Sequence, residues 1–327
     1  MEYKMHVEHR AFNSDRKFGV EFEVSPTFHK EVIGLFIKEY EAQANSNISV
    51  RVEGGIKGWS ESHNNDYWHV KYDSSCGPKD GTKSKTPGWE IASYICQGTE
   101  DIDRVANMAD YLSFCGLQTN PNCGFHIHVD TSDFSEVEMG ILHSHWMSVE
   151  RVMIHSLPKH RRYNKHCSPL HRRFKHVSCN NPQSLWEALR PDNFCPHENR
   201  QKKVAINSVG YAQGRVYQHY SRKTLELRLP ECILEKEYVE NWIRLYLHFV
   251  DTVKNREFCD YSKTFSNPMA ELLWVFGLEE KDGDKFVLLS QELYDLKVWF
   301  LQRIIRNSGN KKFAKLAREK CEYITQL

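Results

Sequence analysis

The sequence lacks an apolar run long enough to span a membrane, and it lacks an excess of charge of either sign. Among its 327 residues, 44 Lys and Arg are balanced by 43 Asp and Glu. No global charge therefore favours a nucleic acid or a membrane surface as the partner. The segment 1–17 is polar and has no apolar core of a signal peptide. These absences predict a cytoplasmic protein of one large domain or two ordinary ones.

Closely spaced cysteine pairs are also missing, although the chain contains ten cysteines. No two of them show the C-x2-C or C-x4-C spacing on which zinc knuckles are built. Without a secretory signal, we expect reduced thiols that mostly fill the core. None of them is assigned as a nucleophile.

What the sequence does have is strict two-residue alternation, most clearly over residues 122–130. This stretch reads Asn-Cys-Gly-Phe-His-Ile-His-Val-Asp, so its apolar side chains share one face while His126, His128 and Asp130 share the other. Such alternation predicts a half-buried strand. Two imidazoles on its polar face are typical of a metal or phosphate site, although an ordinary solvated face can also carry them.

Four other segments alternate in the same way and carry ionisable side chains on their polar faces. They are residues 17–25 with Glu21 and Glu23, 68–73 with Asp73, 89–93 with Glu90, and 222–230 with Glu226 and Arg228. Apolar residues at helical spacing predict helices over 29–44, 100–116, 135–157, 238–254, 293–305 and 312–325. If the strands share a sheet, the fold is α+β: helices cover the apolar face of a mainly antiparallel sheet, and a concave, acid-lined face remains.

Such a polar face favours cations. Several carboxylates in one cleft repel one another, and their pKa values rise unless positive charge neutralises them. Mg²⁺ and Mn²⁺ prefer carboxylate oxygens and accept an imidazole, and a pair of such ions can clamp phosphate oxygens. Arg228 would supply a fixed fork for phosphate. The alternative is an ordinary wet sheet face, but such faces mix Thr, Lys, Ser and Gln with acids, whereas these strand centres are almost wholly Glu, His and Arg.

Six short motifs also resemble, in order and spacing, those of the putative amidoligase family, relatives of glutamine synthetase and the glutamate–cysteine ligases. The motifs are Phe-Gly-Val-Glu-Phe-Glu (18–23), Trp-His-Val-Lys-Tyr-Asp-Ser-Ser (68–75), Gly-Trp-Glu-Ile-Ala-Ser (88–93), Asn-Cys-Gly-Phe-His-Ile-His-Val-Asp (122–130), Arg-Arg-Tyr-Asn (161–164), and Asn207 followed by Thr-Leu-Glu-Leu-Arg-Leu (224–229). The resemblance covers roughly residues 17 to 250.

The resemblance implies a glutamine synthetase-like catalytic domain over residues 1–255. A basic, loop-rich excursion at 159–203 would interrupt it, and a helical extension at 256–327 would follow. The activity implied is that of an ATP-dependent ligase that joins a carboxylate to an amine through an acyl phosphate. Its cofactors would be ATP and two or more Mg²⁺ or Mn²⁺ ions.

The same resemblance assigns roles position by position. The implied metal ligands are Glu21, Glu23, Glu90, His126 and Glu226. His128 would contact the nucleotide phosphates, Arg228 would stabilise the transferred phosphate, and Arg162, or Arg161 in its place, would contact phosphate or substrate. Arg228, Arg162 and Glu90 form the implied catalytic set.

Two departures leave the carboxylate and the amine unidentified. Asp73-Ser74-Ser75 stands where the family often has Asp-Gly-Ser, and Ser93-Tyr94 stands where it often has Ser-Pro. Both lie near the loop 74–88, which is rich in Gly, Ser, Lys and Pro and is expected to act as a lid over the substrate.

Two other functions remain open. His126-x-His128 with carboxylates could hold a single Zn²⁺ for hydrolysis, because three protein ligands and a water suffice. Alternatively, residues 159–176 could bind nucleic acid, since they contain seven Lys or Arg, four His and no acid, with Tyr163 and Phe174 among them. A basic run with few aromatic residues is also typical of a solvated loop or of a site for an acidic substrate.

Overall fold

A computed structural model describes most of the chain, and within it the chain divides into two compact units. The described residues are 6–53, 66–77, 88–189, 203–211, 223–256, 265, 267–279 and 285–324. Unit 1 comprises Met1–Ser14, Asp130–Leu229 and Arg244–Leu327, and unit 2 comprises Asp15–Val129 and Pro230–Ile243. Residues 78–87 of the expected lid and 190–202 of the basic excursion lie outside the described residues. The predicted domain boundary at residue 255 stays a prediction.

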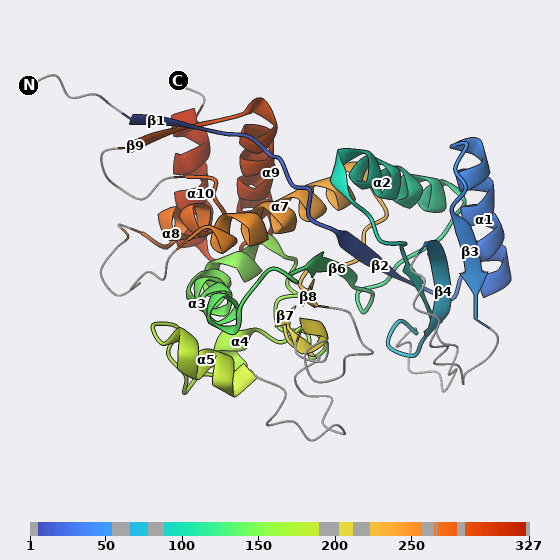
Figure 1. The fold of residues 1–327 in the computed structure, drawn as a ribbon, viewed down its shortest axis with the longest axis horizontal. Coiled ribbons are helices and arrows are strands. Elements are labelled where there is room, and N and C mark those ends of the chain that lie inside the picture. Colours follow the sequence, from blue (N-terminus) through green and yellow to red (C-terminus); the bar gives the residue numbers. More distant parts are fainter. Residues whose placement is uncertain are drawn as a thin grey trace, which may run out of the picture. The chain divides into compact units, whose positions relative to one another are not determined.

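The sheet of unit 2 is mainly antiparallel, as predicted for an α+β fold (Figure 1). Its strands lie in the order β3 (Ser49–Val52), β4 (Tyr67–Asp73), β5 (Gly88–Ala92), β2 (Phe18–Val24) and β6 (Phe125–Asp130). Only β3 and β4 of this set run parallel, and the other neighbours are antiparallel. Strand β2 shows the predicted alternation, because its apolar side chains are buried while Gly19 and Glu21 between them are partly exposed.

Helices α1 (Lys30–Gln43) and α2 (Gly98–Phe114) belong to the same unit, and α1 packs on β3 and β4. Between the strands, the rings of Phe22 and Phe125 stack with their centroids 5.2 Å apart, and both are fully buried. The indole of Trp68 donates a hydrogen bond of 2.7 Å to Glu41, a buried carboxylate on α1. The apolar side of this sheet is thus a packed core, which leaves the opposite side for polar chemistry.

Unit 1 is mostly helical. Its elements are α3 (Glu136–Met153), a 3₁₀ turn (Ile154–Ser156), α4 (Leu170–Arg173), α5 (Pro182–Leu189), β7 (Ile206–Asn207), β8 (Thr224–Leu227), α8 (Pro268–Val275), α9 (Gln291–Asn307) and α10 (Lys311–Ile324). Strands β7 and β8 pair antiparallel. The ring of Trp146 packs against Tyr246, Phe249 and Phe276 at the centre of the core. Helix α7 (Lys236–Lys254) has residues in both units. Among the described helices, none combines the length and the apolar content needed to cross a membrane.

Some elements of unit 1 were not predicted from the sequence. Strands β1 (His6–Arg10) and β9 (Lys285–Leu289) pair in parallel, and neither carries a long alternating pattern. Helix α8 did have a local signal, because the side chain of Asn267 accepts hydrogen bonds from the first turn and Pro268 opens the helix. Asn followed by Pro is a favourable N-terminus for a helix. Helix α4 was not predicted because a helix of four residues is too short to show an apolar repeat in the sequence.

A buried histidine in α3 makes the stability of the protein depend on pH. His143 is fully buried, its Nδ1 donates to the carbonyl of Met139 at 2.7 Å, and burial lowers its pKa from 6.5 to about 4. The unfolded chain therefore binds a proton between these two values, whereas the folded chain does not. The free energy of unfolding should fall as pH drops from about 6.5 to about 4, with a contribution of ~3 kcal/mol from this group.

Replacing His143 by Leu should flatten that dependence, because the titrating group is lost while most of the volume is kept. Denaturant unfolding across this pH range measures the effect. The matched control is His176→Gln, since His176 is exposed, and its pH profile should follow that of the wild type. Parallel profiles for His143→Leu and the wild type would contradict the assignment.

Candidate functional site

Strand register in unit 2 gathers the predicted metal ligands on the polar face of the sheet. Glu21 on β2 lies opposite His126 on β6, and Glu23 lies opposite Glu90 on β5. Lys71 on β4 lies opposite Glu90 on the other side of β5. Because side chains of paired residues project to the same face, each pairing places ionisable groups side by side.

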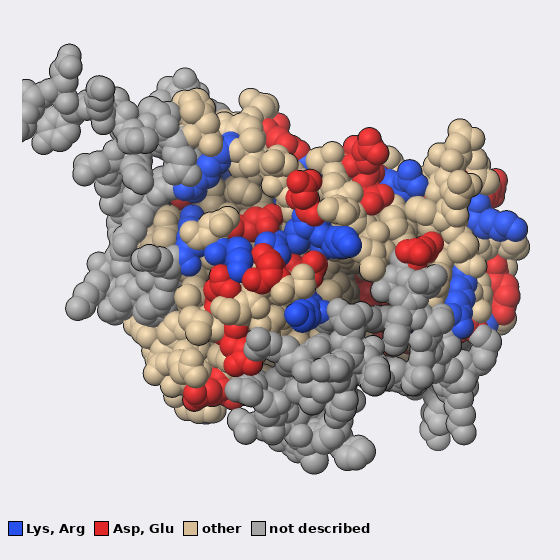
Figure 2. Space-filling view, in the orientation of Figure 1, with Lys and Arg blue, Asp and Glu red and all other residues tan. Residues whose placement is uncertain are grey.

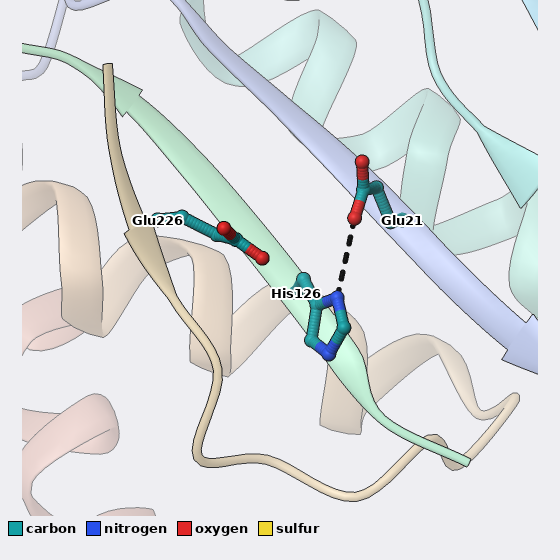
Figure 3. A group of neighbouring side chains, drawn as sticks. All are labelled: Glu21, His126 and Glu226. Atoms are coloured by element: carbon teal, nitrogen blue, oxygen red, sulfur yellow. Dashed lines mark hydrogen bonds and ion pairs between the residues drawn. The ribbon is translucent and has the colours of Figure 1, made fainter. Parts of the chain in front are cut away.

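Glu21 is the centre of this cluster. One of its oxygens lies 3.2 Å from Nδ1 of His126, as Figure 3 shows, and the other lies 3.3 Å from Nε2 of His128. Nζ of Lys71 is 3.7 Å from Glu21 and 2.5 Å from an oxygen of Glu90. Two imidazoles, two carboxylates and one ammonium group therefore form a continuous polar network.

Glu23 adds a third carboxylate, which is almost completely buried. One oxygen accepts a hydrogen bond of 2.5 Å from the amide of Gly124, and the other lies 3.5 Å from Nε2 of His126. His126 therefore lies between Glu21 and Glu23, with one ring nitrogen near each. The metal-ligand role of His126 stays a prediction.

The carboxylates of this face have opposite pKa shifts. Burial raises the pKa of Glu21, but the charges of His128 and Lys71 and the hydrogen bond with His126 outweigh burial and hold that pKa well below its usual value. Burial and the neighbouring charge of Glu21 raise the pKa of Glu90 to about 8, against the opposing effect of Lys71. In the absence of another cation, the face thus keeps Glu21 ionised and favours a proton on Glu90.

In unit 1, β8 carries Glu226, and Arg228 follows the last residue of this strand, Leu227. Glu226 forms an ion pair with Arg228 and accepts a hydrogen bond of 2.6 Å from the side-chain amide of Asn207 on β7. Nε of Arg228 donates to the main-chain carbonyl of His166 at 3.2 Å. The guanidinium group is therefore held in a fixed direction by a carboxylate and a carbonyl.

The two arginines of the Arg-Arg-Tyr-Asn motif contact main-chain carbonyls. Arg161 is 1% exposed and donates to the carbonyls of Leu229 and Arg228, at 3.1 and 3.0 Å. Arg162 donates to the carbonyls of Leu157 and Asn307. Arg161 thus supports the end of β8, next to Arg228, while a substrate contact by Arg162 would require it to leave these partners. The predicted role of Arg162 stays a prediction.

Two further residues of the basic segment 159–176, Arg172 and His171, have partners within unit 1. Arg172 stacks over the ring of Tyr163, with its guanidinium carbon 3.8 Å from the ring centroid. His171 forms an ion pair of 2.8 Å with the fully buried carboxylate of Glu150. Much of the positive charge that the sequence shows here therefore has a partner inside the fold.

Sequence reasoning assigned no role to two residues that the structure places beside the predicted ligands. Lys71 bridges Glu21 and Glu90, and Asn207 orients Glu226. The signal for Lys71 was its place on the polar side of an alternating strand, and Asn207 was already part of a motif. Only the strand register shows which carboxylates they contact.

Comparison with known proteins identifies the family. A family model described as putative amidoligase enzyme matches residues 14–250, a range that contains every predicted site residue and most of the chain. A search of curated proteins gives no match. On the match over residues 14–250, the chain belongs to the putative amidoligase enzyme family.

Proposed function

We propose that this protein is an ATP-dependent ligase that joins a carboxylate to an amine through an acyl phosphate. One observation carries the proposal: in a chain of the amidoligase family, two histidines contact Glu21 on one sheet face, and Glu21 and Glu90 both pair with Lys71. We also propose that this sheet is the catalytic sheet of a glutamine synthetase-like domain. The carboxylate and amine substrates remain to be identified by experiment.

The donor groups of unit 2 fit a divalent metal. The carboxylates of Glu21, Glu23 and Glu90 offer hard oxygen ligands, and His126 offers a nitrogen, which is a set that Mg²⁺ and Mn²⁺ accept. The ammonium group of Lys71 pairs with Glu21 and Glu90, so a metal ion would have to displace it from these carboxylates or share them with it. A bound Mg²⁺ or Mn²⁺ would neutralise the charge of the ATP phosphates. The metal role of Glu226 stays a prediction.

The reaction would proceed in two steps, and the protein's own groups would act on the phosphates. A carboxylate oxygen of the substrate attacks the γ-phosphorus of ATP, the bond to the bridging oxygen breaks, and ADP leaves. The amine then attacks the acyl carbon, loses a proton, and inorganic phosphate departs with the electron pair of its oxygen. Arg228, fixed by Glu226 and the carbonyl of His166, would stabilise the charge that develops on the transferred group, and His128 would contact the nucleotide phosphates.

ADP release with Mg²⁺ or Mn²⁺ tests this proposal. The assay should use a panel of amino acids, polyamines, nucleotides and proteins, with mass analysis of any product. We expect metal-dependent ADP formation that requires both a carboxylate and an amine, with one amide formed for each ADP. Metal-dependent hydrolysis that needs no ATP would overturn the proposal and favour the zinc-hydrolase alternative on His126 and His128.

Replacing Arg228 by Lys should lower the turnover of ATP by ~10²–10³-fold, because lysine keeps the charge but loses the fixed fork. Metal binding should be much less affected, since Arg228 donates and does not ligate. Steady-state kinetics of ADP release and Mn²⁺ titration measure the two effects separately.

The matched control for Arg228→Lys is Arg172→Lys in the same unit, where the arginine is exposed and stacks on Tyr163. It should retain turnover. Equal activity of Arg228→Lys and Arg172→Lys would contradict the role of Arg228.

The nucleic-acid alternative has less support. On the face shown in Figure 2, Lys and Arg of the described residues lie interspersed with Asp and Glu. Arg161 and Arg162, the centre of the basic segment, are nearly buried. A mobility shift of RNA or DNA that weakens steeply with salt would nonetheless favour this alternative.

A further inference from the structure

The turn that follows β4 in unit 2 brings a sulfur donor next to two carboxylates. Asp73 ends β4, and Cys76 lies three residues later in the turn, where it is fully buried. One ligand atom each of Asp73, Cys76 and Glu23 lies within 4.8 Å of the other two. The Asp-x-x-Cys spacing lets a single turn present two donors to the same place, while Glu23 comes from β2 of the same sheet.

A second thiol borders this group. The side chain of Cys123, which precedes β6 and is fully buried, lies close enough to Cys76 to influence the pKa of its thiol. Cys123, burial, and the charges of Glu23 and Asp73 together raise the pKa of Cys76. The cluster thus offers one sulfur and two carboxylate donors, and a second sulfur borders it.

The backbone around the cluster is held in place by several contacts. The amide of Ser75 donates to Asp73 at 2.6 Å, and the side-chain amide of Asn120 donates to the carbonyl of Cys76 at 2.9 Å. A Cβ atom added to Gly88 would lie 2.3 Å from Cβ of Cys76, so β5 packs directly against this cysteine. These contacts hold the backbone of the turn in place, so that only small shifts of the donor side chains are needed to reach an ion.

Sulfur donors decide which metal the site would select. Thiolates favour Zn²⁺ over hard ions such as Mg²⁺, and four protein donors make the closed, tetrahedral set of structural zinc sites. Zinc ligands at about 2.0–2.3 Å from the ion lie ~3.5 Å from one another. Asp73, Cys76 and Glu23, whose ligand atoms lie within 4.8 Å, would need to move together by about 1 Å, and Cys123 would approach as the fourth donor. We propose that Cys76, Cys123, Asp73 and Glu23 form a zinc site that fixes the turn after β4 to the sheet.

This inference goes beyond the proposed ligase activity, although Glu23 belongs to both sets of donors. Its test is therefore zinc binding itself, so that failure of either proposal leaves the other standing. The full-length protein, reduced and stripped of metal with a chelator, should take up one Zn²⁺ in competition with a chromophoric chelator. The Co²⁺ form should show the near-ultraviolet charge-transfer band of thiolate ligation.

The variant Cys76→Ser should bind Zn²⁺ more than ~100-fold more weakly and should lose the charge-transfer band, because loss of a direct ligand exceeds the effect of losing an outer contact. Cys96→Ser is the matched control, since Cys96 is equally buried in unit 2 but lies outside the cluster. It should bind Zn²⁺ like the wild type, and excess Mg²⁺ should not displace the ion.

Should Cys76→Ser fail to fold, Asp73→Asn gives the same answer, because Asp73 is partly exposed and its amide can still accept from Ser75. Weaker Zn²⁺ binding by Asp73→Asn supports the site. The proposal is overturned if the wild type takes up no Zn²⁺, if its Co²⁺ form lacks the thiolate band, or if the variants bind Zn²⁺ as tightly as the wild type.

Discussion

Glutamine in place of Glu21 is expected to weaken Mn²⁺ binding at least ~100-fold and to abolish metal-dependent ADP release. The substitution keeps the size of the side chain and removes its charge. Glu21 is the carboxylate that both His126 and His128 contact, at 3.2 and 3.3 Å, and Lys71 lies 3.7 Å away. Without the charge of Glu21, the cluster loses the carboxylate that both histidines contact and, with it, a ligand oxygen for a divalent cation. Electron paramagnetic resonance of free Mn²⁺ measures the affinity without any knowledge of the substrates.

The matched control is Glu41→Gln, because Glu41 is also a buried carboxylate of unit 2 but accepts its hydrogen bond from Trp68 on the helix-covered side. This variant should retain Mn²⁺ binding and lose ~1 kcal/mol of unfolding free energy. If Glu21→Gln binds Mn²⁺ as tightly as Glu41→Gln does, Glu21 is not a metal ligand. If circular dichroism shows that Glu21→Gln does not fold, Glu21→Asp takes its place in the comparison with Glu41→Gln. Aspartate keeps the charge and shortens the side chain.

The largest effect on stability is expected from Glu150→Ala in α3. The carboxylate of Glu150 is fully buried and accepts four hydrogen bonds: from the indole of Trp146, from the amides of Leu170 and His171, and from the ring of His171, all at 2.8–2.9 Å. Alanine leaves all four donors without this acceptor in the core. We expect a loss of ~3–5 kcal/mol in unfolding free energy, measured by urea denaturation.

The same variant should loosen one segment in particular, because Glu150 ties the start of α4 to α3. Amide hydrogen exchange should accelerate at Leu170 and His171 more than in the core around Trp146. Glu187→Gln on the exposed side of α5 is the control, and it should change the unfolding free energy by less than ~0.5 kcal/mol. If Glu150→Ala lowers the unfolding free energy no more than Glu187→Gln does, these hydrogen bonds make no net contribution to stability.

Local patterns determined much of the sheet before any contact was known. Strict alternation identified β2, β5, β6 and β8, because a strand with one buried face must repeat every two residues. The same pattern put Glu21 and His126 on polar faces and their apolar neighbours in the core, as the structure confirms.

Pairings between distant segments could not be read from such patterns. The parallel pairing of β1 with β9 joins residues near the two ends of the chain, and five-residue strands give little local signal. The guanidinium groups of Arg161 and Arg162 looked available for a substrate in the sequence. Their burial against main-chain carbonyls depends on how loops fold back onto β8 and α9.

The sequence by itself therefore determined the faces of the strands and the kinds of group on each, since period and residue type are local properties. Tertiary structure decided which groups meet. Strand register selected His126 and His128 as the partners of Glu21 and placed Lys71 beside the same carboxylate. It also placed Cys76 against Cys123, whose spacing resembles no zinc motif, beside Glu23 and Asp73. Side chains far apart in the chain meet only where strands pair, because register is fixed by the packing of whole elements.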